Sequence, residues 1–201
     1  MKQDARTGKP WMSIKLVVAA AIVLCVGAVV FLVLLRRDSA LARELDGKPL
    51  ALESSSFADG GVISKQYTCD GAGISPELHW AGPPNGTRSL AIVMNDPDAP
   101  VDFTHWLLFN LPPGARELAE GASPSGLPQG SAEGTNSFDR IGYGGPCPPV
   151  GPPHHYVFRL YALDTRLDLP VGAGRRQLEA AINGHVLAQG RLIGLYRRTG
   201  E

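Results

Sequence analysis

Polar residues that could bind a ligand or transfer a proton lie at the borders of three apolar runs. Asp96 and Asp98 come directly after one run, His105 opens the next, and His154 and Tyr156 open a third. Imidazole and phenol groups donate hydrogen bonds to anions, and a carboxylate can accept from an imidazole and orient it. Since loops at strand ends often carry binding residues, this pattern predicts a polar site where several strands end.

A glycine- and proline-rich segment precedes the third run and supplies a candidate wall for this site. Glycine allows a ligand to approach the backbone closely, and free N–H groups there can bind an anion. Proline lacks an N–H donor and makes a loop rigid. The candidate wall residues are Gly144, Gly145, Pro146 and Pro148.

The same residues are compatible with ligand binding and with acid–base catalysis. A hydrolase or lyase would use Asp96, His105 and His154 as acid–base groups. However, the sequence has no Gly-x-Ser-x-Gly elbow and no His-Glu-x-x-His metal motif. We therefore expect a binding module with no catalytic residue, no metal and no cofactor, and keep the hydrolase or lyase as the alternative. A third interpretation is a structural or adhesive domain without a pocket.

Composition favours a loop-rich β domain with no affinity for nucleic acid. Glycine and proline number 24 and 17 of 201 residues, and they concentrate where apolar runs alternate with turn residues. Lys+Arg and Asp+Glu are both 19, so no net charge attracts a nucleic acid. Runs rich in β-branched and aromatic residues predict strands. The predicted strands are 62–67, 78–80, 89–94, 105–110, 156–163 and 191–196, and the predicted helices are 175–182 and 185–189.

The amino-terminal part of the chain predicts a membrane segment. Residues 16–35 are twenty consecutive residues without a charge or a strongly polar group. A helix of that length crosses the ~30 Å hydrocarbon core of a bilayer. We accordingly assign a cytoplasmic segment (1–13), a single transmembrane anchor (14–36), a tether (37–48) and a domain (49–201).

Basic residues on the two sides of this run predict its orientation. Four precede it and three follow it, which favours a cytoplasmic N-terminus and an exported domain. The alternative is a signal peptide cleaved after the Ala40-Leu41-Ala42 sequence, which would release a secreted domain. The length of the apolar run, and Arg36 and Arg37 directly after it, favour the uncleaved anchor.

Taken together, the three polar segments resemble the phosphatidylethanolamine-binding protein family, in its bacterial and archaeal Raf-kinase-inhibitor-like branch. The resemblance covers roughly residues 50–198 and follows the family order of motifs. The main motifs are Asp96-Pro97-Asp98-Ala99-Pro100, the run from His105 to Asn110-Leu111-Pro112, and Gly145-Pro146-Cys147-Pro148-Pro149 with His154-x-Tyr156. Supporting matches are Tyr67-Thr68-Cys69-Asp70-Gly71, Ser75-Pro76-x-Leu78-x-Trp80 and Gly184-His185-Val186-Leu187-Ala188.

The resemblance implies a mostly β fold, an antiparallel β-sandwich with short C-terminal helices, and a pocket for a phosphate-like anion. The implied ligand is a phosphorylated small molecule or a phospholipid head group, and a kinase or protease is an implied protein target. The pocket residues would be Asp96, His105, His154 and Tyr156, with Asp98 and Trp106 as neighbours and residues 144–149 as the wall. His155 stands where the family often has arginine, which removes a permanent charge near the mouth.

Two further expectations rest on the same resemblance. Cys69 and Cys147 are expected to lie close together, as a disulfide if the domain is exported or otherwise as two free thiols. The Ala99–Pro100 peptide bond is expected to be cis, since only bonds that precede proline adopt cis at a low cost.

Overall fold

The strands predicted from the sequence fall within residues 48–199, the part of the chain that the computed structural model describes. The predicted cytoplasmic segment (1–13), the anchor (14–36) and all of the tether except Lys48 lie outside the described residues. Within residues 48–199, no helix is long and apolar enough to cross a membrane.

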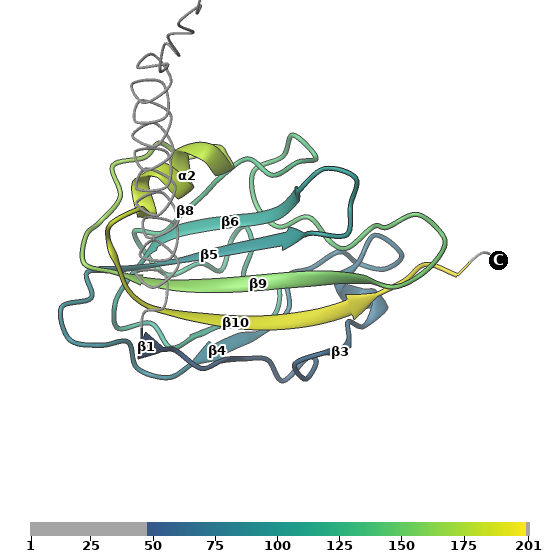
Figure 1. Ribbon diagram of the computed structural model, residues 1–201, viewed down its shortest axis with the longest axis horizontal. Coiled ribbons are helices and arrows are strands. Elements are labelled where there is room, and N and C mark those ends of the chain that lie inside the picture. The colour runs from purple at the N-terminus through teal and green to yellow at the C-terminus, as the bar shows by residue number, and fades with distance from the viewer. Residues whose placement is uncertain (1–47, 200–201) are drawn as a thin grey trace, which may run out of the picture. The chain divides into compact units, whose positions relative to one another are not determined.

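Seven strands form the larger of two sheets (Figure 1). Their order is β1-β10-β9-β5-β6-β8, and β3 also pairs with β10. The pairs from β10 to β8 are antiparallel, whereas the short β1 and β3 run parallel to β10. The strands are β1 (Lys48–Pro49), β3 (Gly61–Val62), β5 (Ser89–Asp96), β6 (Phe103–Leu111), β8 (Ala132–Glu133), β9 (His154–Leu163) and β10 (Val186–Tyr196).

A smaller sheet shares a hydrophobic core with one face of the larger sheet, which we call the inner face. It consists of β2 (Leu52–Glu53), β4 (Leu78–Trp80) and β7 (Glu117–Leu118). Burial of apolar side chains between the two sheets is the main force that holds them together. Fully buried members of this core include Leu78, Leu90, Ile92, Met94, Trp106, Leu108, Tyr156, Phe158 and Leu160.

The outer face of the larger sheet is covered by the helix α2 (Arg175–Ile182). Leu178 and Ile182, one helical turn apart, pack in one cluster with Val93 of β5 and Leu107 of β6. Because both faces of β5 are covered, all eight of its residues are buried. This explains why β5 reads as a continuous apolar run in the sequence and not as an alternating one.

The structure confirms a mostly β fold with one short helix near the C-terminus, and it corrects two predicted elements. Residues 185–189, predicted as a second short helix, instead belong largely to β10, whose residues Val186 and Ala188 pair with β9. Of the region predicted as a strand over 62–67, only Val62 pairs, as part of β3 (Gly61–Val62), and Lys65–Tyr67 form a 3-10 turn. At residues 186–189, pairing with β9 decided the local conformation, whereas local hydrogen bonds close the turn at Lys65–Tyr67.

The Ala99–Pro100 bond is trans, so the expectation of a cis bond was wrong. Among the described residues the only cis peptide bond is Ser123–Pro124. Trans is the lower-energy form of most bonds before proline, and the 96–100 turn closes without the cis form.

Candidate functional site

The ends of β5 and β10 and the start of β9 meet at one end of the larger sheet, on the right of Figure 1. Asn95 of β5 pairs with Val157 of β9, and Tyr196 of β10 pairs with His154. This pairing brings together residues up to a hundred positions apart in the chain. The predicted site residues therefore gather at one end of the sheet, as the sequence pattern indicated.

His105 reaches the inner face of the sheet through a β-bulge. Met94 of β5 pairs with Trp106 of β6. The next residue of β5, Asn95, pairs with Thr104, so His105 is the extra residue of β6. Strict alternation along the strand would turn His105 to the face opposite Trp106. The bulge re-aims its side chain toward the inner face.

Aromatic contacts place the His105 ring within the inner cluster. It meets the Tyr156 ring edge to face, with the centroids 5.1 Å apart. Phe103 and Phe138 flank the same imidazole at 5.1 and 5.4 Å. Neither phenylalanine was assigned a role from the sequence, since an apolar ring gives no signal for an anion site.

Asp96 fixes both the turn after β5 and the ring of His154. One carboxylate oxygen, Oδ1, accepts hydrogen bonds from the backbone N–H groups of Asp98 (2.9 Å) and Ala99 (3.2 Å). The other, Oδ2, accepts from Nδ1 of His154 at 2.7 Å. The two side chains are only 5% and 11% exposed, respectively. Asp96 thus orients the imidazole, and the opposite ring nitrogen, Nε2, is left to face other groups.

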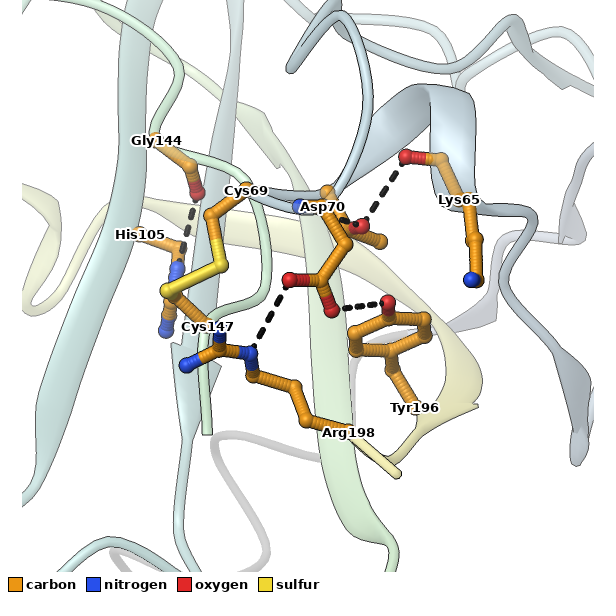
Figure 2. The surroundings of a disulfide bond; sticks show 9 residues. Lys65, Cys69, Asp70, His105, Gly144, Cys147, Tyr196 and Arg198 are labelled. Atoms are coloured by element: carbon orange, nitrogen blue, oxygen red, sulfur yellow. Dashed lines mark hydrogen bonds and ion pairs between the residues drawn. A yellow bond between two sulfur atoms is a disulfide. The ribbon is translucent and has the colours of Figure 1, made fainter. Parts of the chain in front are cut away.

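The His105 imidazole has a defined tautomer. Its Nδ1 lies 2.8 Å from the carbonyl oxygen of Gly144, which can only accept, so Nδ1 carries the proton (Figure 2). Burial lowers the pKa of His105 below its usual range, and the ring is neutral at neutral pH. In a neutral ring with Nδ1 protonated, Nε2 is a hydrogen-bond acceptor.

Tyr156 presents a buried phenol that has no partner among the described residues. The residue is fully buried, and its Oη atom makes no hydrogen bond there. The Asp96 carboxylate lies close to this hydroxyl, and burial, followed by the negative charge of Asp96, raises the pKa of Tyr156 far above its usual range. The phenol therefore keeps its proton and remains a donor. An unsatisfied buried donor is uncommon in folded proteins and often marks a functional group or a bound molecule.

The predicted wall is tied to a neighbouring turn by a disulfide bond. Cys69 and Cys147 are bonded, with their Cα atoms 5.4 Å apart (Figure 2). The N–H of Cys69 also donates to the carbonyl of Pro146 at 3.1 Å. Both cysteines are exposed, whereas Pro146 and Pro148 are buried. These bonds fix the loop whose Gly144 carbonyl sets the tautomer of His105.

The two wall glycines serve close packing of the loop. A Cβ atom on Gly144 would lie 2.6 Å from the Phe138 ring, and one on Gly145 would lie 2.7 Å from the Tyr67 carbonyl oxygen. The N–H of Gly144 donates to the His105 carbonyl at 2.8 Å and is not free for an anion. This N–H therefore joins the loop to β6, and ligand binding by the wall residues stays a prediction.

Asp98 and Trp106, expected as neighbours of the site, differ in position. Asp98 is exposed and accepts from the backbone N–H and from Nδ1 of His155, both at 2.7 Å. These two hydrogen bonds lower the pKa of Asp98. Trp106 is fully buried, and its indole N–H donates to Glu133 at 2.7 Å. Asp98 thus ties the turn to β9, and Trp106 belongs to the core.

A second polar cluster, not expected from the sequence, lies beside the disulfide (Figure 2). Asp70 accepts from the Tyr196 hydroxyl at 2.6 Å and from Arg198 Nε at 3.0 Å. The bond from Tyr196, followed by the charge of Arg198, lowers the pKa of Asp70. These residues border a groove of about 480 Å³ that Lys65, Val150, Arg197 and Thr199 also line. None of the grooves described in the structure is lined by Asp96, His105 or His154. The predicted site is a tight polar cluster next to a groove.

Comparisons with known proteins agree with this fold. The family model described as phosphatidylethanolamine-binding protein matches residues 53–197. A protein of Methanothermobacter thermautotrophicus named "UPF0098 protein" is 51% identical over 149 residues, which are 73% of this chain and 98% of that protein. The crystal structure of Escherichia coli YbcL, described as a member of the mammalian PEBP family, superimposes with a TM-score of 0.72 at 30% identity, covering 75% of this chain and 99% of YbcL.

A third relative bears on localisation. A Mycobacterium tuberculosis protein named as a candidate lipoprotein, LppC, is 41% identical over 151 residues, covering 74% of this chain and 73% of that protein. The chain belongs to the phosphatidylethanolamine-binding protein family, and its described domain is a member of that fold.

Proposed function

We propose that the domain is a binding module that holds a phosphate-like anion or a phosphorylated head group at Asp96, His105, His154 and Tyr156. The observation that carries the proposal is the buried Tyr156 phenol, a protonated donor without a partner among the described residues. It lies against His105, and Asp96 orients His154 nearby. A buried donor of this kind is satisfied when an anion oxygen accepts its hydrogen.

We further propose that the domain is exported and held at a membrane by the segment 14–36. Two observations support this. A relative is named as a candidate lipoprotein, and the disulfide joins two exposed cysteines, a bond that persists in oxidising compartments. A reporter fused after Glu201 tests the orientation. Activity of a cytoplasmic reporter would contradict it, and a soluble product that begins near Arg43 would show that the segment is cleaved.

The observation that favours the alternative, catalysis, is the His154–Asp96 pair, because a histidine oriented by a carboxylate can act as a general base. A nucleophile is harder to assign. The two cysteines of the described domain are joined to each other, so neither offers a thiolate. We therefore propose that the domain binds its ligand without turnover. Regulation of a kinase or protease by docking is a separate proposal, for which no residues of the described domain are assigned.

Calorimetry with O-phosphorylethanolamine on the full chain in a neutral detergent tests the binding proposal. We expect measurable binding that His154→Ala or Tyr156→Phe weakens roughly ten- to hundred-fold, since each removes a hydrogen-bonding group at a buried charge. The matched control is His185→Ala, an exposed histidine that also contacts an aspartate, Asp164, at 2.7 Å. Unchanged affinity in both site variants would disprove the assignment of the site. Phosphate release from the same ligand would favour catalysis.

A further inference from the structure

The cluster combines one fixed acceptor with one fixed donor. The carbonyl oxygen of Gly144 accepts a hydrogen bond from Nδ1–H of His105, so Nε2 of the neutral ring offers a lone pair. Tyr156 offers its hydroxyl hydrogen and makes no hydrogen bond within residues 48–199. The two rings are in contact, with the centroids 5.1 Å apart. The acceptor and the donor therefore belong to one cluster of touching side chains.

This combination discriminates between anions by the proton that they carry. A fully deprotonated oxyanion accepts a hydrogen bond from the Tyr156 hydroxyl, but its oxygen lone pairs repel the lone pair on Nε2 of His105. An oxyanion that keeps one acidic proton satisfies both groups, because its P–OH donates to Nε2 while another oxygen accepts from the phenol. A buried polar group that is left without a partner weakens binding strongly.

We propose that the site selects a tetrahedral oxyanion that carries its own proton, namely hydrogen phosphate or a phosphomonoester monoanion. It discriminates against sulfate and against phosphodiesters, which have no acidic proton to donate at neutral pH. This inference rests on the proposed function of the same four residues, and it specifies the chemistry of the ligand. A free phosphomonoester is then preferred to an intact diacyl phospholipid, whose phosphate is a diester.

The charges around the two histidines support the same selection. Asp96 of β5 contacts His154 and lies near His105 and Tyr156. Asp98 lies on the turn beside them, bonded to His155. The other groups packed against His105 are the neutral Phe103, Phe138 and Gly144. Since the carboxylates of Asp96 and Asp98 lie beside the cluster, the monoanion of a phosphomonoester is repelled less than its dianion.

The discriminating measurement is a ratio of affinities across pH. A phosphomonoester dianion gains one proton near pH ~6 and becomes the monoanion, whereas a diester gains none between pH 5 and 8. We expect the monoester-to-diester affinity ratio to rise at least about ten-fold between pH 8 and pH 5.5, as the protonated fraction of the monoester grows.

Calorimetry on the full-length protein in neutral detergent would compare four probes: O-phosphorylethanolamine, its soluble diester glycerophosphorylethanolamine, inorganic phosphate and sulfate. We expect inorganic phosphate to bind roughly ten- to hundred-fold more tightly than sulfate at pH 7. In His105→Gln, the side-chain amide can rotate to donate or accept. Both affinity ratios, phosphate to sulfate and monoester to diester, should then fall toward one. In Tyr156→Phe, all four probes should weaken while the ratio keeps its pH dependence.

Each outcome decides between the inference and the proposed function. If sulfate or the diester binds as tightly as its protonated counterpart at every pH, the inference is overturned and the proposed function stands. If none of the four probes binds the wild-type protein, both are overturned. Should His105→Gln fail to fold, the pH dependence of the wild-type ratio still decides, and a flat ratio refutes the inference.

Discussion

The two ends of the larger sheet each carry a histidine that contacts an aspartate at the same distance. At the site end, Nδ1 of His154 lies 2.7 Å from Asp96, and at the opposite end, Nδ1 of His185 lies 2.7 Å from Asp164. The first pair is 11% and 5% exposed, and the second is 46% and 47% exposed. The contact is therefore the same, and the surroundings differ.

The burial of the histidine–aspartate pair, and not the contact itself, therefore distinguishes the site end. Asp96 also accepts two backbone N–H groups of its turn, and the pair lies at the same strand ends as the buried Tyr156. Asp164 and His185 lie in an exposed connection between strands. In water an exposed pair gains little, because solvent and salt screen it, whereas a buried carboxylate must keep its partners.

The largest difference between the two ends should appear when each aspartate is removed. We expect Asp96→Ala to lower the free energy of unfolding by about 3–5 kcal/mol, since it strands a buried histidine and two backbone donors. Asp164→Ala should cost less than about 1 kcal/mol. Urea denaturation of the two variants measures both values. Equal losses would show that enclosure does not set the strength of the pair.

The disulfide gives the site end a second constraint, and its removal should have the next largest effect. Replacing Cys69 and Cys147 together by serine should lower the free energy of unfolding by about 2–4 kcal/mol, because the bond closes a loop of 78 positions. Hydrogen exchange of the Gly144 amide should also accelerate relative to amides of β10. A loss of stability without faster exchange at Gly144 would separate the disulfide from the geometry of His105.

Acidification should lower the free energy of unfolding, because His105 at the site end becomes protonated in the unfolded chain. Burial lowers its pKa, while the unfolded chain keeps a histidine pKa near ~6.5. Between these two values the unfolded chain binds more protons, so the free energy of unfolding falls as the pH drops below ~6.5. The contribution of His79 to the free energy of unfolding depends on pH in the opposite sense. The hydrogen bond to Glu77 raises the pKa of His79, so its stabilising contribution is lost as the pH rises.

Urea titrations between pH 5 and 7 measure this slope. His105→Gln removes the titrating group and should make the free energy of unfolding less dependent on pH over this range. The matched comparison is His79→Gln, which removes the opposing contribution and should make the slope steeper. A wild-type slope that neither variant changes would refute the role of His105.

The smallest effect is expected for the second pair at the site end. Asp98 and His155 also lie 2.7 Å apart, but their side chains are 41% and 54% exposed. His155→Ala should therefore change the free energy of unfolding by less than about 1 kcal/mol, as His185→Ala should. If His155→Ala proves as costly as Asp96→Ala, position at the site end matters more than burial.

The sequence alone was enough to identify the family and to predict where the site lies. The strand runs that end at Met94 and begin at His105 and Tyr156 were predictable, because an apolar run bounded by turn residues is a local signal. The motif order around Asp96, His105 and His154 identified the family, which the comparisons confirmed.

The orientation and the hydrogen bonds of the site side chains depend on tertiary contacts. The bulge at His105 depends on the register between β5 and β6, and the strand at residues 186–189 depends on pairing with β9. The tautomer of His105 depends on Gly144, 39 positions away. The indole of Trp106 is buried in the core and donates to Glu133. These features arise from contacts between segments far apart in the chain, and propensities summed over neighbouring residues do not contain that information.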